Sequence, residues 1–303
     1  MTIAIVGGTG FVGNRVADLL RAAGHRVVIL SRRTGTDLAS PDPAALARAL
    51  EGCAALVLCA GINREIGSQT YDAVHIRGTA AAVAAAKETG VQHVVMLSFL
   101  RARPDGPSHY HRSKWAAEVI VRESGIPFTV LKAGVIYGRG DHMLDHLSRA
   151  LRTFPVFGLV GMRERPVRPV AVDDVARLLA AAATGEPRLR DRTIEVLGPD
   201  QLPLGDAVRC VGEVIGRRPT YVRLPVAAHL LLASAFESLM RVPLVSIAQV
   251  RILAEGVVEA APAAEPPPAD LAPATPFSAV SIRAGLPEPA GFGRRDLRWC
   301  AAR

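Results

Sequence analysis

Short apolar runs alternate with amphipathic stretches over the first 140 residues. The first run, 3–6, is too continuous for a half-exposed strand and is typical of a parallel strand buried on both faces. The stretch 12–23 places its apolar residues on one face of a helix, and Gly24 follows it. Helical stretches separate four further apolar runs, at residues 26–30, 55–59, 91–97 and 127–131. This alternation predicts an α/β protein with a doubly wound parallel sheet.

A glycine-rich turn joins the first predicted strand to the first predicted helix. Its sequence follows the pattern Gly-x-x-Gly-x-x-Gly. Strand, glycine turn and helix in this order are typical of a dinucleotide site, where bare backbone and a helix N-terminus contact a pyrophosphate. The alternative is an ordinary tight turn between a strand and a helix. The cofactor contacts expected here are Gly7, Thr9, Gly10, Phe11, Val12 and Gly13.

The end of the second predicted strand indicates which cofactor is bound. An acidic residue there would bind the ribose 2′-hydroxyl of NAD, but the strand ends in Ser31, Arg32 and Arg33. Two arginines suit a 2′-phosphate, so we expect NADP(H) in preference to NAD(H). The alternative is that both arginines point to solvent.

The segment after these arginines is too short for a complete Rossmann sheet. A parallel crossover needs a dozen or more residues, and only three separate Arg33 from Asp37. We therefore expect a reduced sheet edge after the second strand. A helix over 43–50 and a buried strand over 55–59 follow. The turn Ala60-Gly61 should then face the cofactor, because ligands lie beyond the carboxyl ends of parallel strands.

The pattern loosens beyond residue 140 and predicts a smaller C-terminal α/β unit that contacts substrate. The expected divisions are a Rossmann domain over 1–183, a substrate domain over 184–258, and an Ala/Pro-rich linker and tail over 259–303. The apolar stretch 226–240 is too short to span a bilayer, so packing within the small domain is favoured over a membrane-surface or partner helix. The tail either docks through Phe292, Leu297 and Trp299 or remains mobile.

Composition and charge limit the classes of partner that we expect this protein to bind. The formal net charge is +8 and the sequence pI about 9.9, which would suit nucleic acid, anionic lipid or a phosphorylated substrate. The arginines are spread along the chain without a dense basic block, so we expect a small-molecule substrate and no nucleic acid. The sequence contains no run of about 20 apolar residues, so we expect no membrane-spanning helix. The N-terminus begins directly with a predicted strand, so we expect no signal peptide. We expect the protein in the cytoplasm. We expect it to be a monomer or a homodimer.

Three residues form a candidate catalytic group. Tyr110 and Lys114 are four apart on a predicted helix and share a face, and Ser98 ends the strand over 91–97 on the cofactor side. A nearby ammonium lowers the pKa of a phenol, so that tyrosine can exchange the proton of a carbonyl/alcohol pair. Ser98 would hold the substrate oxygen, and Lys114 would also bond the nicotinamide ribose. The alternative is a surface tyrosine and lysine.

The sequence offers no pattern typical of a metal site. The cysteines at 53, 59, 210 and 300 lack metal-ligand spacing, and His142 and His146 have no acidic partner motif. We therefore expect no metal.

These features together resemble the extended or atypical short-chain dehydrogenase/reductases, which are similar to NAD(P)-dependent epimerases and dehydratases. The spacing from Ser98 to Tyr110 looks most like NAD(P)H-binding proteins related to the nucleotide-binding accessory subunit of respiratory complex I. The matching pieces are GGTGFVG at 7–13, Asp37-Leu38, Ala60-Gly61, VHIRGT at 74–79, Ser98, YHRSK at 110–114, KAGVIYGRGD at 132–141, FPVFG at 154–158 and VAVDDVA at 170–176.

The resemblance implies a Rossmann fold with a small C-terminal substrate domain. It also implies that Asp37 and Leu38 lie beside the adenine, and that Ala133 and Val135 cradle the nicotinamide end. The chain departs from the family pattern where His75 replaces an asparagine of many extended members. Lys132-Ala133 likewise replaces the usual Arg-Pro.

Two functions remain open from the sequence. The first is an NADP(H)-dependent oxidoreductase or epimerase acting on a small carbonyl or hydroxyl substrate. The second is a non-catalytic NADPH-binding accessory or assembly protein of a membrane respiratory complex, which the basic charge and the apolar stretch 226–240 would suit. The second function would also imply that the protein associates peripherally with a membrane.

Overall fold

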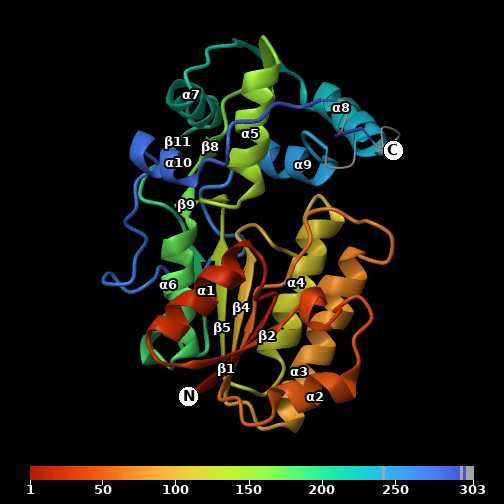
Figure 1. Cartoon of the computed structure of the whole chain (residues 1–303), viewed down its shortest axis with the longest axis vertical. Helices are drawn as coiled ribbons and strands as arrows, with labels where there is room; N and C mark the ends of the chain where they lie inside the picture. The colour runs from red at the N-terminus through yellow and green to blue at the C-terminus, as the bar shows by residue number, and fades with distance from the viewer. Residues whose placement is uncertain (241–242, 294–295, 298–303) are drawn as a thin grey trace. The chain divides into compact units, whose positions relative to one another are not determined.

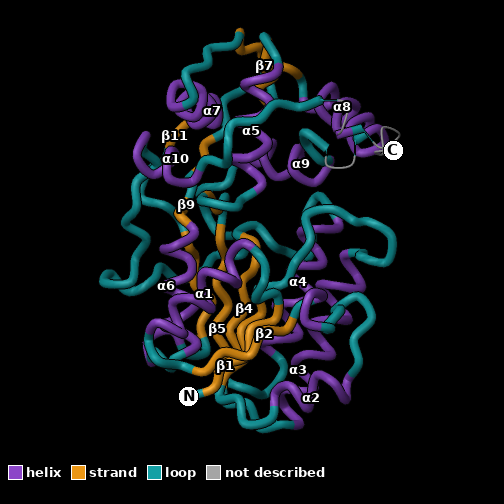
Figure 2. Tube along the Cα trace, viewed as in Figure 1, coloured by secondary structure: helices purple, strands orange, loops and turns teal. Residues whose placement is uncertain are grey.

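Six parallel strands form the sheet that carries the glycine-rich turn (Figure 2). The computed structural model describes residues 1–240, 243–293 and 296–297. The strand order is β10-β5-β4-β3-β1-β2, and every neighbouring pair is parallel. The six strands are β1 (Thr2–Val6), β2 (Arg26–Leu30), β3 (Ala55–Leu58), β4 (His93–Phe99), β5 (Phe128–Ala133) and β10 (Arg192–Val196). The doubly wound parallel sheet predicted from the sequence is confirmed.

Helices cover both faces of this sheet (Figure 1). On one face, alanines of α3 permit close packing, and Asp42 caps α2 by accepting hydrogen bonds from the backbone of Ala44 and Ala45. This face is covered by α2 (Pro43–Leu50), α3 (Gly78–Glu88) and α4 (His109–Arg122), and the opposite face by α1 (Phe11–Ala22) and α6 (Val172–Ala183).

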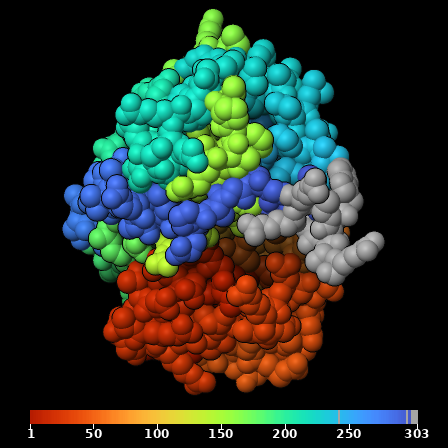
Figure 3. All heavy atoms as spheres, turned by 45° about the horizontal axis from the view of Figure 1, so that its top comes forward, coloured from red at the N-terminus to blue at the C-terminus, as the bar shows by residue number. Residues whose placement is uncertain are grey.

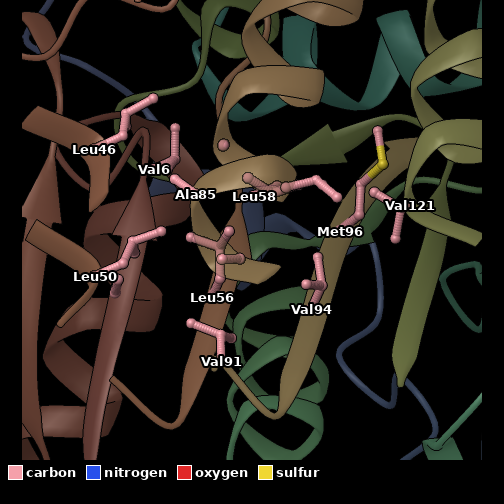
Figure 4. Packing of buried hydrophobic residues seen from close by; sticks show 14 of the residues in the cluster. Val6, Leu46, Leu50, Leu56, Leu58, Ala85, Val91, Val94, Met96 and Val121 are labelled. Carbon is pink, nitrogen blue, oxygen red and sulfur yellow. The ribbon is translucent and has the colours of Figure 1, made fainter. Parts of the chain in front are cut away.

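The apolar runs of the sequence form the core between the sheet and α2, α3 and α4. Because the central strands are covered on both sides, they are almost completely buried, which explains their continuous apolar character. Figure 4 labels the residues that interlock in this layer: Val6, Leu46, Leu50, Leu56, Leu58, Ala85, Val91, Val94, Met96 and Val121.

The sheet is reduced on the side of β2, as the short segment after Arg33 predicts. A 3₁₀ turn, η1 (Arg32–Thr34), follows β2, and the chain then enters α2 without forming another strand. β2 is therefore the edge of the sheet, next to β1. The helical stretch before β4 is not a single α-helix, because a π-helical segment, η2 (Asp72–Arg77), precedes α3.

The chain divides into two units, which we describe separately. Unit 1 comprises Met1–Gly134, Val172–Leu197 and Glu259–Ala274, and unit 2 comprises Val135–Ala171, Gly198–Val258 and Thr275–Arg303. Unit 2 contains the strands β6 (Ile136–Tyr137), β7 (Val156–Val160), β8 (Pro166–Val167), β9 (Val170–Ala171), β11 (Leu202–Pro203) and β12 (Thr220–Leu224). Its helices are α5 (His142–Thr153), α7 (Leu204–Val214), α8 (Val226–Leu239), α9 (Ile247–Glu255) and α10 (Ala279–Gly285).

Within unit 2, the segment after α10 packs across α5 (Figure 3). The Arg149 guanidinium lies 4.1 Å from the ring centroid of Phe292 and donates a 2.7 Å hydrogen bond to Asp296. The backbone nitrogen of Phe292 donates to the Thr153 hydroxyl. Phe292 therefore docks, and Leu297 forms a β-bridge with Met240. Trp299, the third residue expected to dock, lies outside the described residues.

The Ala/Pro-rich segment differs from the linker expected over 259–276. Residues 259–274 belong to unit 1, where Glu265 exchanges backbone hydrogen bonds with β10. Nearby, the buried Lys132 ammonium donates hydrogen bonds to the carbonyl oxygens of Ala102 (2.8 Å) and Ala261 (3.1 Å). The composition predicted a linker because prolines and alanines show no strand pattern. The segment is nevertheless bound to the protein, through the backbone of Glu265 at the edge strand β10 and through the hydrogen bond from Lys132 to Ala261.

We expect Lys132→Met to destabilise the protein by about 3 kcal/mol or more. The substitution keeps most of the side-chain volume but leaves the fully buried Glu118 without this cation and Ala261 without its donor. Arg192→Met, which removes an exposed ion pair to Glu265, is the matched control and should have a much smaller effect. Chemical denaturation followed by circular dichroism checks this, and equal losses would contradict it.

Candidate cofactor and catalytic site

The glycine-rich turn brings β1, β3 and α1 into backbone contact. Gly7 has a positive φ of 82°, and a Cβ added there would lie 2.6 Å from the backbone nitrogen of Ala60. A Cβ on Gly13 would lie 2.3 Å from the Gly7 carbonyl oxygen. Gly10 is the N-cap residue of α1 and supplies no side-chain cap. The glycines of this turn thus leave the backbone at the N-terminus of α1 open, which fits the diphosphate of a dinucleotide.

The remaining residues expected at this turn line it to different extents. Thr9 is exposed and Phe11 is half-buried, whereas Val12 is buried in the first turn of α1. Val12 therefore contributes packing and a backbone amide.

The two arginines at the end of β2 are exposed on η1. Thr34 holds this turn by accepting a hydrogen bond from the backbone of Ser31 and donating one to the Ile29 carbonyl. Arg32 and Arg33 project from the turn at the edge of the sheet. Their exposure is compatible with a 2′-phosphate ligand and with the alternative of solvated side chains.

Asp37 and Leu38, expected beside the adenine, make protein contacts of their own. The Gln69 side-chain amide donates to both carboxylate oxygens of Asp37 at 3.0 and 3.2 Å, and the Ala39 backbone donates at 3.0 Å. These hydrogen bonds, with the charge of Arg32, hold the pKa of Asp37 below its usual value. Leu38 is buried, and its carbonyl lies against Gly78.

The turn after β3 faces the buried lysine of α4. A Cβ on Gly61 would lie 3.5 Å from His75 Nε2 and 3.8 Å from Lys114 Nζ. Lys114 donates a 2.9 Å hydrogen bond to the Leu97 carbonyl, and burial lowers its pKa to about 8. Burial also raises the pKa of the neighbouring Cys59 thiol to about 12, so this cysteine is neutral at physiological pH.

Tyr110 lies among aromatic rings from three elements. Its ring centroid is 5.3 Å from that of Phe99, 5.8 Å from that of His75 and 5.9 Å from that of Tyr71. Burial, chiefly, raises the pKa of Tyr110, in the direction opposite to the lowering expected from Lys114. The phenol is therefore neutral in this structure. No protein group within the described ranges shares a hydrogen bond with its hydroxyl.

Ser98 does not join Tyr110 and Lys114 through a hydrogen bond. Its hydroxyl donates a 2.5 Å hydrogen bond to Glu118, which is fully buried. The Glu118 carboxylate also accepts hydrogen bonds from the Arg122 guanidinium at 3.0 Å and from the Lys132 ammonium at 3.4 Å. The structure therefore engages the Ser98 hydroxyl in a buried polar cluster under α4.

His75 is a site residue whose role the sequence did not reveal. The backbone N–H of Ile62 donates to its Nε2 at 3.0 Å, so the proton lies on Nδ1, which donates to the Ser113 hydroxyl at 2.9 Å. Ser113 in turn donates to the Tyr110 carbonyl. Burial, with the charge of Lys114, holds the pKa of His75 well below its usual value. A neutral imidazole thus connects the turn after β3 to α4.

Ala133 and Val135, expected at the nicotinamide end, lie in different units. Ala133 ends β5 and is buried, and its carbonyl accepts a hydrogen bond from the backbone of Leu100. Val135 begins unit 2, and its carbonyl accepts from Val170.

Within the described ranges, no group of three His, Cys, Asp or Glu side chains could hold a metal ion. None of the helices there combines the length and the apolar character needed to cross a bilayer.

Comparison with known proteins gives a family match and several relatives. A family described as NAD(P)H-binding matches residues 7–186. The chain is 28% identical over 259 residues to a ceramide reductase of Caulobacter vibrioides, covering 80% of each protein. It is 25% identical to the mitochondrial NADH dehydrogenase [ubiquinone] 1 alpha subcomplex subunit 9 of Arabidopsis thaliana, over 73% of this chain and 60% of that subunit.

Solved structures share the fold. MoeE5 in complex with UDP-glucose and NAD superposes with a TM-score of 0.62 at 23% identity, over 74% of this chain and 85% of that one. The structure of gox2253 gives a TM-score of 0.62 at 22% identity, over 94% and 96% of the two chains.

The buried, neutral His75 predicts a loss of stability at acid pH. Its native pKa lies below the unfolded value of 6.5, so below that pH the unfolded chain binds a proton that the native chain does not. The free energy of unfolding should therefore fall, by up to about 1.4 kcal/mol per pH unit. His75→Asn should show a shallower fall between pH 6.5 and the native pKa. Denaturation across this range measures the difference, with exposed His109→Asn as control, and identical slopes for wild type and His75→Asn would contradict it.

Proposed function

Because this chain belongs to the NAD(P)H-binding family, we propose that it is an NAD(P)H-dependent oxidoreductase that reduces an apolar aldehyde or ketone. The observation that carries the proposal is the pair Tyr110 and Lys114. They lie one turn apart on α4, with the lysine against the turn after β3. Among the residues that the structure describes, none shares a hydrogen bond with the phenol hydroxyl.

The residues divide the work of such a reduction. NAD(P)H supplies the hydride when it is bound. The backbone amides in the first turn of α1, which have no partner within the helix, hold the diphosphate. The Lys114 ammonium donates hydrogen bonds to the ribose hydroxyls. Tyr110 donates the proton to the carbonyl oxygen. The phenol is protonated in this structure, and the protonated form is the one that a reduction consumes.

The surroundings of Tyr110 support an apolar substrate. Phe99, Tyr71 and His75 present rings around the phenol, and His75 is neutral because of burial. A strongly polar ligand would lose hydration here without gaining many partners. The similarity to a protein named ceramide reductase, over four fifths of both chains, supports the same direction and substrate class.

One observation favours a second candidate, an NAD(P)H-binding accessory protein without turnover. The Ser98 hydroxyl, expected to hold the substrate oxygen, is instead bonded to Glu118. The similarity to a protein named as a subunit of NADH dehydrogenase suits this candidate. Both candidates require cofactor binding, but only the oxidoreductase requires the Tyr110 hydroxyl.

Tyr110→Phe separates the two candidates. We expect it to lower the kcat of NADPH-dependent reduction of long-chain aldehydes and ketones by about 100-fold or more, because the proton donor is lost. The NADPH dissociation constant should stay unchanged, since the substitution leaves the glycine turn and Lys114 intact. NADPH oxidation by absorbance and NADPH binding by calorimetry measure the two quantities.

Ser98→Ala is the matched control for this experiment. It also removes one hydroxyl but should retain turnover, because that hydroxyl serves Glu118. Equal turnover of wild type and Tyr110→Phe would contradict Tyr110 as the proton donor. No turnover by the wild type with any carbonyl tested would favour the accessory protein.

Arg32→Asp tests the proposed preference for NADP(H). Removing a guanidinium from the 2′-phosphate and adding a carboxylate should weaken NADPH binding by roughly tenfold or more, and leave NADH binding nearly unchanged. Arg48→Asp, an exposed substitution of equal charge on α2, should alter neither. Dissociation constants for both cofactors measure the effect. Equal losses of NADPH and NADH affinity would contradict a 2′-phosphate contact.

A further inference from the structure

Helix α8 of unit 2 is apolar on nearly all sides and yet exposed. Its sequence, VAAHLLLASAFESL, contains one charged residue, Glu237, which accepts a hydrogen bond from the Ile247 backbone. Leu231 is 75% exposed, Leu232 42% and Leu239 41%. A helix of this composition is normally enclosed, either in a protein core or by lipid.

Helix α8 packs through one face against described residues of unit 2. Ala233 is buried beside Val250 of α9, and His229 is buried with Nε2 3.3 Å from the Gly158 carbonyl. The opposite face carries the exposed residues Ala227, Leu231, Leu232, Ser234, Ala235, Ser238 and Leu239. It has no charged side chain, whereas the outer face of a water-exposed helix usually carries several.

Exposed arginines lie at the N-terminal end of this face. The loop 162–165, Met-Arg-Glu-Arg, follows β7, and Met162 is 62% exposed. The backbone of Gly161 donates to the Leu224 carbonyl, and a Cβ on Gly161 would lie 3.8 Å from the Val226 side chain. An exposed methionine, followed by Arg163, Glu164 and Arg165, therefore adjoins the start of α8, and Glu164 forms an ion pair with Arg223.

Unit 2 also carries nearly all of the chain's net charge. It contains 17 arginines against 10 acidic residues, whereas the rest of the chain has 19 basic and 18 acidic residues. Two copies meeting through α8 would bring two such positive units together and repel each other. An anionic surface with an apolar interior would match both the charge and the bare leucines.

We propose that the exposed face of α8, with Met162 and the nearby Arg163 and Arg165, docks on an anionic lipid membrane. The leucines enter the boundary between headgroups and acyl chains, and Arg163 and Arg165 contact lipid phosphates. The helix lies in the membrane surface and does not cross it, because 14 residues extend about 21 Å against a hydrocarbon core of about 30 Å. This surface goes beyond the proposed activity and stands independently of it.

Co-sedimentation of the full chain with vesicles tests the proposal. We expect binding to equimolar phosphatidylglycerol and phosphatidylcholine, much weaker binding to phosphatidylcholine alone, and loss of the preference at about 1 M salt, where the Debye length is about 3 Å. Leu231→Glu should weaken binding to the anionic vesicles roughly tenfold or more. Val280→Glu, at an 81% exposed position on α10, makes the same change of charge and should bind as wild type does.

A second variant keeps the test informative if Leu231→Glu fails to fold. Arg163→Glu with Arg165→Glu changes an exposed loop and should weaken binding to anionic vesicles while leaving the circular dichroism spectrum unchanged. Absence of wild-type binding, or equal binding by these variants and wild type, overturns the proposal. A dimer that Leu231→Glu converts to a monomer, without vesicle binding by the wild type, also overturns it and assigns the face to a second copy.

Discussion

Close approach of three backbone segments at the first turn sets the geometry of unit 1. Gly7 lies against Ala60, and Gly13 lies against the Gly7 carbonyl, at separations that leave no room for a Cβ. β1, β3 and the start of α1 therefore meet through backbone atoms. The same lack of side chains that permits this packing leaves amides at the N-terminus of α1 available for a phosphate. Fold and cofactor site thus depend on one steric constraint.

Helix α4 contributes residues to the candidate site near its start and to a buried polar cluster one turn further along. Near its start, Tyr110 and Lys114 lie at the carboxyl end of the sheet, where the lysine is buried and the phenol is enclosed by rings. One turn further, Glu118 gathers Ser98 and Lys132 in a cluster without solvent. Buried charges persist only when they are paired, so this cluster fixes α4 against β4 and β5. The helix that carries the proposed proton donor is consequently held by electrostatics as well as by apolar packing.

Unit 2 differs from unit 1 because its arginines outnumber its acidic residues and because it exposes apolar side chains. Its helix α8 exposes Leu231 and Leu232 within a unit that is rich in arginine. In unit 1, by contrast, basic and acidic residues nearly balance, and the apolar runs of the strands are enclosed. This contrast is consistent with the cofactor chemistry that we propose for the first unit and with the interfacial role that we propose for the second.

The sequence by itself determined the parallel sheet, its reduced edge after Arg33 and the glycine turn, because these follow from local periodicity, segment length and the absence of side chains. It also placed Tyr110 and Lys114 on one helix face. Only the tertiary structure decided that Ser98 serves Glu118, that His75 bridges Ile62 and Ser113, and that Glu265 pairs with β10. These outcomes depend on which buried donors and acceptors meet across distant segments, and no local pattern records such pairings.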